Sequence, residues 1–322
     1  MRRHPDNPIL TRADLPDIAP SLRDPTSVFN PGALRVGDRD SLLLRVQTRG
    51  RESLLLVADE QADGSFRARE ELFEIEGLDA IEETVHHVYD PRLTRLEGRV
   101  LLCCAVDTDT RCALLVAETD DRLQSARLLS FDPEGDRRNG VIFPKRIDGR
   151  YLRLERPNAP PTEPGEPPSG DRVVLSESPD LVEWRVRAEV FEGRLRTWDE
   201  RIGSGPPPVL TTEGWLLVYH GVATHFGTSN IYQAGVVLLD AEDPGKVLAR
   251  SRRNILEPRE LYELVGQVGN VVFPSGITVE GACSDEPAPP EASVRIYYGA
   301  ADSCVGLVET SVGELVEAAR LD

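Results

Sequence analysis

One pattern of apolar and polar positions recurs five times along the 322 residues of this chain. Each copy begins with a proline, continues as a strand of alternating apolar and polar residues, turns at a glycine, and returns as a mainly apolar strand. Two short strands around a glycine turn are typical of a β-hairpin. The copies begin at Pro31, Pro91, Pro144, Pro207 and Pro274.

A third apolar strand follows the hairpin in every copy, at residues 53–60, 112–120, 173–180, 232–244 and 304–311. The initial prolines are spaced by about 50–70 residues, which is the length of a propeller blade with its loops. Stacked β-sandwich repeats are the structural alternative, but five similar units favour a closed ring with only short sheet edges. With 40% hydrophobic residues, one domain can bury a large core. We therefore predict an all-β fold, a single five-bladed β-propeller formed by residues 1–322.

Helical periodicity is weak outside two segments. Residues 68–82 and the tail 311–322 are amphipathic at helical spacing, which predicts a helix in each. Two stretches, 157–171 and 284–292, are polar and rich in proline, and we expect them to form exposed loops within blades rather than domain linkers.

The formal net charge of −18 at pH 7 argues against binding to nucleic acid or to an anionic membrane through bulk electrostatics. No apolar run approaches the length that crosses a bilayer, and residues 1–12 lack the apolar core of a secretory signal peptide. The five cysteines include no Cys-x-x-Cys spacing, which argues against a disulfide framework or a zinc site. We therefore expect a cytoplasmic protein without a metal ion.

Polar residues gather where the predicted innermost strands and their partners end. Because these strands converge on the axis of a propeller, we expect their end residues to line a central pocket. The residues at these ends are Asn30, Arg45, Asp90, Arg92, Arg138, Asn139, Arg156, Arg201, His220, Phe273 and Asp302. Cations outnumber carboxylates in this group although the whole chain is anionic. Since arginine binds phosphate oxygens in a two-point geometry, the group indicates an anion site.

Asp90 lies between an aromatic residue and a proline, two residues before Arg92. A proline pushes the residue before it into an extended conformation and is often the first residue of a strand. We therefore expect Asp90 to be held rigidly, in an extended conformation, where a strand begins. A turn-forming aspartate without a chemical role is the alternative.

The other candidates also have structural alternatives. Arg45 and Arg156 could each form a salt bridge between blades, and His220 could be a core histidine. Recurrence at equivalent blade positions favours the functional interpretation. His86 and His87 lack metal-ligand spacing, and no phosphate-binding P-loop ending follows the glycines at residues 203–205.

An ordered set of motifs resembles glycoside hydrolase family 130, the β-mannoside phosphorylases. These motifs are RHPDNPIL, VFNPGA, LLLRV, DPRLTR, FPKRIDGRYLRLERP, IGSGPPPV, GWLLVYHGV, GNVVFPSG and YYGAAD, which run from about residue 3 to residue 310. The resemblance implies a five-bladed propeller that performs inverting phosphorolysis of a β-mannosidic bond. The products would be α-mannose 1-phosphate and a shortened acceptor sugar, with inorganic phosphate as co-substrate and no cofactor.

The resemblance also implies roles for individual residues. Asp90 matches the catalytic acid, whose proton is thought to reach the glycosidic oxygen through a hydroxyl of the departing mannose. The positions that match phosphate-binding residues are Arg138, Asn139, Arg156, His220 and Arg201. The positions that match sugar contacts are Asn30, Arg45, Tyr232, Phe273 and Asp302. Two residues depart from the family pattern, because Tyr89 replaces a glutamate and Arg201 replaces a lysine.

Three other functions remain open. A β-mannoside hydrolase on the same fold would use water and would need two carboxylates about 6.5–9.5 Å apart. Phosphate is already an anionic nucleophile, so one acid and a cationic group suffice, and the retained cations favour a phosphorylase. A propeller glycosidase for arabinose or fructose polymers would need two or three acids, of which Asp90 and Asp302 supply two. A non-catalytic, glycan-binding propeller is the last alternative. We expect a β-mannoside oligosaccharide, with a preference for β-1,4 linkages, and phosphate as partners, in a protein that can form homo-oligomers.

Overall fold

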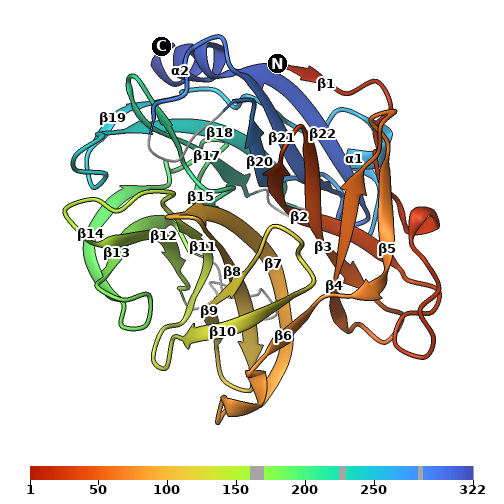
Figure 1. Ribbon diagram of the computed structural model, residues 1–322. Coiled ribbons are helices and arrows are strands. Elements are labelled where there is room, and N and C mark those ends of the chain that lie inside the picture. The colour runs from red at the N-terminus through yellow and green to blue at the C-terminus, as the bar shows by residue number, and fades with distance from the viewer. Residues whose placement is uncertain (160–169, 225–229, 282–285, 322) are drawn as a thin grey trace.

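The computed structural model describes residues 1–159, 170–224, 230–281 and 286–321. In this part of the chain, five mainly antiparallel sheets surround a common centre (Figure 1). Each third apolar stretch contributes the third strand of its sheet. The expected start of the copies is wrong in two blades, because the innermost strands Arg137–Ile142 and Arg201–Ser204 precede Pro144 and Pro207, whereas Pro31, Pro91 and Pro274 lie within theirs. The predicted five-bladed β-propeller is confirmed.

The first three blades follow the order of the chain. Blade one consists of β2 (Ser27–Val36), β3 (Arg39–Gln47), β4 (Ser53–Glu60) and β5 (Phe66–Leu72). Blade two consists of β7 (Val85–Leu96), β8 (Arg99–Thr108), β9 (Cys112–Thr119) and β10 (Ser125–Phe131), with β6 (Glu74–Glu76) parallel to β10. Blade three consists of β11 (Arg137–Ile142), β12 (Tyr151–Pro157), β13 (Arg172–Ser178) and β14 (Arg185–Glu192).

The last two blades differ at their edges. In blade four, β15 (Arg201–Ser204) and β16 (Val209–Thr211) both pair with β17 (Gly214–Ala223), which is followed by β18 (Ile231–Leu239) and β19 (Val247–Arg250). Blade five consists of β20 (Val272–Val279), β21 (Ser293–Ala300), β22 (Cys304–Ser311) and β1 (Arg2–Arg3).

The N-terminal strand β1 closes the ring. It pairs antiparallel with β22 and so becomes the outermost strand of the last blade. Arg3 then donates from Nε and Nη2 to the two carboxylate oxygens of the buried Glu263, each over 2.8 Å. Both termini lie near each other at the top of Figure 1.

The apolar core lies between neighbouring blades. Leu43 of blade one packs with Leu102 and Leu115 of blade two, and all three side chains are fully buried. Tyr298 of blade five packs similarly with Val236 of blade four. Full burial of such an apolar side chain contributes roughly 1.5–3 kcal/mol. The blade interfaces therefore hold the ring together, and the axis is left for polar side chains.

One of the two predicted helices is confirmed. Helix α2 (Val312–Arg320) begins at the N-cap Ser311, whose hydroxyl accepts from the amide of Glu314, and it buries Leu315 and Val316. The helix predicted over residues 68–82 is wrong, because this segment forms the end of β5, then β6 and a single 3₁₀ turn at Leu78–Ala80. Pairing of β5 with β4 and of β6 with β10 outweighs the local helical pattern. The remaining short helices are α1 (Leu261–Leu264) and a 3₁₀ turn at Arg12–Asp14.

The first proline-rich stretch, 157–171, lies largely outside the described residues, which omit 160–169, whereas the second, 284–292, is described from residue 286 on. Residues 286–292 are mainly exposed, although Ala288 pairs with Thr211 and is buried. The cysteines that the structure describes, Cys103, Cys104, Cys112 and Cys304, are buried free thiols. No helix in the described part of the chain has the length and apolar character that a bilayer crossing requires.

Candidate active site

A cavity of about 520 Å³ lies where the innermost strands of the five blades meet. All eleven residues to which the family resemblance assigns a role lie on its wall, namely Asn30, Arg45, Asp90, Arg138, Asn139, Arg156, Arg201, His220, Tyr232, Phe273 and Asp302. Arg92, which was also expected to line the pocket, is not part of this wall. The rest of the wall is formed by Tyr89, Asp107, Val222, Asn230, Val268 and Val271. A smaller cavity of about 170 Å³, at the opposite ends of these strands, is lined mainly by apolar groups such as Leu34, Leu93 and Ile277. The candidate chemistry is therefore confined to one end of the ring.

Matching β-bulges place three polar side chains at this cavity. The innermost strands of blades one, two and three each insert one extra residue into their pairing, between Phe29 and Gly32, Tyr89 and Arg92, and Arg138 and Val141. The residues inserted there, Asn30, Asp90 and Asn139, have positive φ angles of 47°, 53° and 55°. Bulges re-aim a side chain away from the regular alternation of a strand. Asn and Asp are the non-glycine residues that adopt this left-handed conformation most readily.

The expected backbone of Asp90 is therefore wrong in two respects. Asp90 is not extended, and it lies inside the 12-residue strand β7 rather than at its start. Proline disfavours the right-handed helical conformation in the residue before it. The left-handed conformation that Asp90 adopts is set by the bulge, which depends on how β7 pairs with β8.

Two glycines allow the polar side chains to approach one another closely. A Cβ atom at Gly203 would overlap the His220 ring and the Asn139 amide. A Cβ atom at Gly299 would overlap the amide of Asn30. These close approaches give a physical reason for glycine at both positions.

Asp90 is held as a carboxylate by neighbouring donors and charges. Asn30 Nδ2 and Arg45 Nη1 both donate to Asp90 Oδ1, each over 2.9 Å. Burial by itself would raise the pKa of Asp90, but the charges of Arg45 and Arg92 and these hydrogen bonds lower it below its ordinary value. Arg92 is itself buried under the cavity, where its Nε donates to the carbonyl of Gly205 in blade four over 2.7 Å.

Asp302 has the opposite environment. It has a φ of 49° in the turn between β21 and β22, and no described residue hydrogen-bonds its carboxyl group. Burial, together with the nearby charge of Asp90, raises the pKa of Asp302 to about 6, although Arg45 acts against this shift. In the free cavity Asp90 is therefore ionised at pH 7, whereas the carboxyl group of Asp302 titrates near pH 6.

The third and fourth blades supply a group of buried nitrogen donors. Burial and the neighbouring charge of Arg138 lower the pKa of Arg156 to about 10, so Arg156 stays cationic at pH 7. Burial, followed by the charges of Arg156 and Arg92, lowers the pKa of His220 well below its ordinary value. His220 is therefore neutral at pH 7 and offers one N–H donor and one acceptor.

Several buried polar atoms of this cavity have no hydrogen-bond partner among the described residues. They are Asn30 Oδ1, Arg45 Nε, Arg138 Nε, Asn139 Oδ1, Arg156 Nε and both ring nitrogens of His220. Buried polar groups in folded proteins are nearly always paired. Unpaired donors next to like-charged guanidinium groups therefore indicate a site for a ligand with several acceptor oxygens and negative charge.

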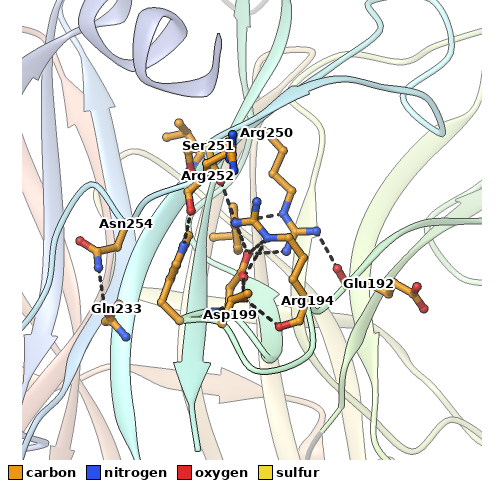
Figure 2. Close-up of polar contacts among 12 residues, drawn as sticks. Glu192, Arg194, Asp199, Gln233, Arg250, Ser251, Arg252 and Asn254 are labelled. Carbon is orange, nitrogen blue, oxygen red and sulfur yellow. Dashed lines mark hydrogen bonds and ion pairs between the residues drawn. The ribbon is translucent and has the colours of Figure 1, made fainter. Parts of the chain in front are cut away.

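A buried carboxylate anchors the segment that leads into Arg201. Asp199 is fully buried, and its Oδ2 accepts from Arg194 Nη2 over 2.8 Å, from Tyr219 OH over 2.8 Å and from Arg250 Nη2 over 2.6 Å. Figure 2 shows the side chains of Arg194 and Arg250 converging on Asp199. These bonds fix the chain two residues before β15 begins.

The same segment also packs on the strand that carries His220. Trp198 stacks on Tyr219, with ring centroids 5.7 Å apart and an interplanar angle of 29°. Gly221 leaves room for this indole, because a Cβ atom there would lie 2.6 Å from the Trp198 ring. Since Arg201 and His220 follow these anchored residues directly, the packing fixes where both enter the cavity.

Sequence reasoning missed Asp107 as a cavity residue. Asp107 accepts a hydrogen bond from Tyr89 OH over 2.8 Å and lies 3.4 Å from Arg138 Nη2. A signal for it existed, because Asp107 is two residues beyond Ala105, which pairs with Tyr89 across the sheet. Strand alternation therefore places Ala105 and Asp107 on the same face.

In the described part of the chain, no group of three or more His, Cys, Asp or Glu side chains is arranged to hold a metal ion.

Comparison with known proteins agrees with this geometry. The sequence model of glycoside hydrolase family 130, described as beta-1,4-mannooligosaccharide phosphorylase, matches residues 1–321. The chain belongs to glycoside hydrolase family 130. Among curated relatives in the family, a beta-1,4-mannooligosaccharide phosphorylase of Ruminococcus albus is 35% identical over 235 residues, which is 71% of this chain and 64% of that protein. A 4-O-beta-D-mannosyl-D-glucose phosphorylase of Bacteroides fragilis is 26% identical over 90% of this chain and 74% of its own length.

Solved structures support the fold assignment. The complex of beta-1,2-mannobiose phosphorylase from Listeria innocua with beta-1,2-mannobiose superposes with a TM-score of 0.79, at 24% identity, over 98% of both chains. The family 130 propeller thus covers the whole of this chain, whereas the named linkages differ between its relatives.

Proposed function

We propose that this family 130 protein is an inverting glycoside phosphorylase that cleaves β-mannosidic linkages with inorganic phosphate. The products are α-mannose 1-phosphate and a shortened acceptor sugar. The observation that supports this proposal most directly is the group of unpaired buried donors on Arg138, Arg156 and His220, in the same cavity as the carboxylate of Asp90. A phosphate ion supplies the negative charge and the acceptor oxygens that these donors lack.

In the proposed reaction, a phosphate oxygen forms a bond to the anomeric carbon while the bond from that carbon to the acceptor oxygen breaks. Attack from the face opposite the leaving group inverts the configuration. The acceptor oxygen takes up a proton as it departs, and we assign the supply of this proton to Asp90, through a hydroxyl of the mannose. Asn30, Arg45, Tyr232, Phe273 and Asp302 are assigned to sugar binding, and Arg138, Asn139, Arg156, Arg201 and His220 to phosphate binding.

The ionised state of Asp90 in the free cavity is compatible with this role. Its pKa is held down by Arg45 and Arg92. Bound phosphate adds negative charge to the same cavity, and a like charge raises the pKa of a carboxyl group. We therefore expect Asp90 to become protonated when phosphate and sugar are both bound, which is when an acid is needed.

We propose a β-1,4 linkage as the preferred substrate, because the relative with 35% identity carries that linkage in its name. Other relatives are named for 1,2-β-mannosides, among them a 1,2-beta-oligomannan phosphorylase of Thermoanaerobacter at 28% identity. A direct test therefore offers both linkages.

The deciding experiment supplies β-1,4-mannobiose and β-1,2-mannobiose separately, with and without inorganic phosphate. Chromatography then separates mannose 1-phosphate from free mannose. We expect mannose 1-phosphate, only with phosphate present, and faster from the β-1,4 substrate. Equal cleavage without phosphate, with free mannose as the only sugar product, would replace this proposal with a hydrolase. Faster cleavage of the β-1,2 substrate would correct the linkage alone.

A further inference from the structure

Tyr89 lies between two parts of the cavity, namely the residues that hold Asp90 and the group of unpaired donors. Its side chain is 5% exposed, on the innermost strand β7 directly before Asp90. The centre of the Arg45 guanidinium lies 4.4 Å from the Tyr89 ring centroid, and that of Arg138 lies 5.8 Å from it. Arg45 holds Asp90, whereas Arg138 belongs to the group of unpaired donors. One aromatic ring therefore contacts a cation from each part.

The aromatic ring of Tyr89 helps to fix the position of the Arg45 side chain. The Arg45 guanidinium also lies 4.6 Å from the centroid of Phe29, so it is placed between two aromatic rings. Contacts of this kind are worth about 0.5–2 kcal/mol and restrict where the guanidinium can lie. Because Arg45 Nη1 donates to Asp90 Oδ1, the position of Arg45 also determines the charge environment of that carboxylate.

The hydroxyl side of Tyr89 restrains Asp107. Tyr89 OH donates to Asp107 Oδ1 over 2.8 Å, while the same oxygen lies 3.4 Å from Arg138 Nη2. The contact with Arg138 is long for a charge-assisted hydrogen bond, which is normally 2.7–2.9 Å. Asp107 lines the cavity and is the nearest carboxylate to Arg138. Without its hydrogen bond from Tyr89, the Asp107 carboxylate would be free to move closer to Arg138. It would then neutralise the positive charge that a bound anion needs.

We propose that Tyr89 is a positioning residue of this site, whose ring fixes Arg45 against Asp90 and whose hydroxyl keeps the ion pair between Asp107 and Arg138 at its long distance of 3.4 Å. The proposal rests on the proposed function in one respect, namely that the anion bound by Arg138 is phosphate. It assigns Tyr89 no contact with the reacting atoms. In this proposal Asp107 competes with the bound anion for Arg138, and the hydrogen bond from Tyr89 limits that competition.

A double-mutant cycle tests the hydroxyl. The variants are Tyr89→Phe, Asp107→Asn and the two combined, and the probe is inorganic phosphate in isothermal titration calorimetry. Tyr89→Phe should weaken phosphate binding by about three- to tenfold, in line with the loss of one restraining hydrogen bond. Asp107→Asn should bind phosphate as tightly as the unmodified protein, or more tightly. In the combined variant the effect of Tyr89→Phe should vanish, because the competing carboxylate is gone.

Tyr297→Phe provides a matched control. Tyr297 OH donates to the buried Asp40 over 2.6 Å in the wall between blades one and five, away from the cavity. Its removal deletes the same kind of bond and should lower the melting temperature without changing phosphate affinity. A Tyr89→Phe variant that behaves like this control would overturn the inference, as would an equal loss of affinity with and without Asp107.

A second variant tests the ring. Tyr89→Leu removes the aromatic contact with Arg45, so Arg45 should hold Asp90 less firmly and the pKa of Asp90 should rise. We expect the apparent pKa in the pH profile of kcat/KM to move upward in Tyr89→Leu and to return to its normal position in Tyr89→Phe, which keeps the ring. Identical profiles for both variants and the unmodified protein would overturn this part.

The calorimetric test separates the inference from the proposed function. If the protein binds phosphate but releases no mannose 1-phosphate from any β-mannoside, the proposed reaction is wrong. The double-mutant cycle still tests the role of Tyr89 in that case, because it measures phosphate binding alone. If the unmodified protein binds no phosphate, both proposals are wrong.

Discussion

Asp199 and Asp90 are both aspartates bound by arginine, yet they have opposite surroundings. Asp199 lies in the ring wall, where Arg194, Arg250 and Tyr219 all donate to the same carboxylate oxygen and Thr197 donates to the other. Asp90 lies at the axis, and both of its side-chain hydrogen bonds go to Oδ1. Among the described residues, both oxygens of Asp199 accept hydrogen bonds from side chains, whereas only Oδ1 of Asp90 does, which leaves Asp90 Oδ2 available to a ligand.

Unpaired buried polar atoms also distinguish the cavity from the ring wall. Of the twelve buried side-chain atoms without a hydrogen-bond partner in the described part of the chain, seven belong to residues that line the cavity. In the wall, Asp40 accepts from Thr278, Arg295 and Tyr297 and is fully buried. The cavity therefore differs from the ring wall in its unpaired hydrogen-bonding atoms, and not in its charge alone.

The largest effect is expected from Asp90→Asn. Asparagine keeps the shape of the side chain but cannot donate an acid proton, so turnover should fall by about 10²–10⁴-fold. The melting temperature should change little, and the loss should be smaller for an aryl β-mannoside with an activated leaving group. Steady-state rates on both substrates and the melting temperature, taken from one preparation, check this. A destabilised variant with equal losses on both substrates would place Asp90 with the wall carboxylates.

Asp199→Asn should act mainly on stability. Removing one partner of a buried charge cluster leaves the other charges uncompensated and typically costs about 3–5 kcal/mol of unfolding free energy. Urea denaturation followed by fluorescence measures this cost. At temperatures where the variant is folded, we also expect weaker phosphate binding, because the segment before Arg201 loses its anchor. A fully stable variant would contradict the assignment of Asp199 to the wall.

Arg156→Ala should raise the KM for phosphate and leave the KM for the sugar nearly unchanged. Loss of a hydrogen bond to a charged group costs about 1.5–3 kcal/mol, which corresponds to a factor of roughly 10–150 in KM. Initial rates at varied phosphate with saturating mannoside give the KM for phosphate. Initial rates at varied mannoside with saturating phosphate give the KM for the sugar. Unchanged phosphate kinetics would show that Arg156 serves only the blade structure.

The smallest effect concerns Asp302→Asn and depends on pH. The pKa of Asp302 is about 6 in the folded protein and is near its ordinary value when unfolded. Folding therefore favours the protonated form, and stability is lost as the pH rises through 6. The variant avoids this loss, so it should be more stable than the parent at pH 8 and equally stable at pH 4. The difference at pH 8 amounts to at most about 3 kcal/mol. Thermal melts of both proteins at the two pH values check the sign.

Much of the site was predictable from the sequence because a propeller repeats one unit. The segment at Pro144 follows β11 and does not align in this way, but the residues directly before Pro31 and Pro91 have equivalent places in β2 and β7. Asn30 and Asp90 could therefore be assigned to one cavity. Their roles in catalysis and binding remain predictions that the experiments above address.

Features that depend on pairing between strands were not predictable. The left-handed backbone of Asp90 follows from the extra residue in β7 opposite β8, and local sequence rules favoured an extended residue instead. The helix predicted over residues 68–82 failed for the same reason, since its residues pair with β4 and β10. The position of Asp107 was missed because it follows the apolar part of its strand.

Ring closure through β1 also has a consequence for synthesis on the ribosome. Arg2 leaves the ribosome before the five blades do, but its partner Glu309 lies 307 positions later in the chain. The outermost strand of blade five can therefore dock only after all other blades have emerged. Until then β22 is an uncovered sheet edge, the kind of surface through which chains join one another. Contacts of such long sequence separation form slowly, so the interval before closure is the period in which the nascent protein is most exposed to misassembly.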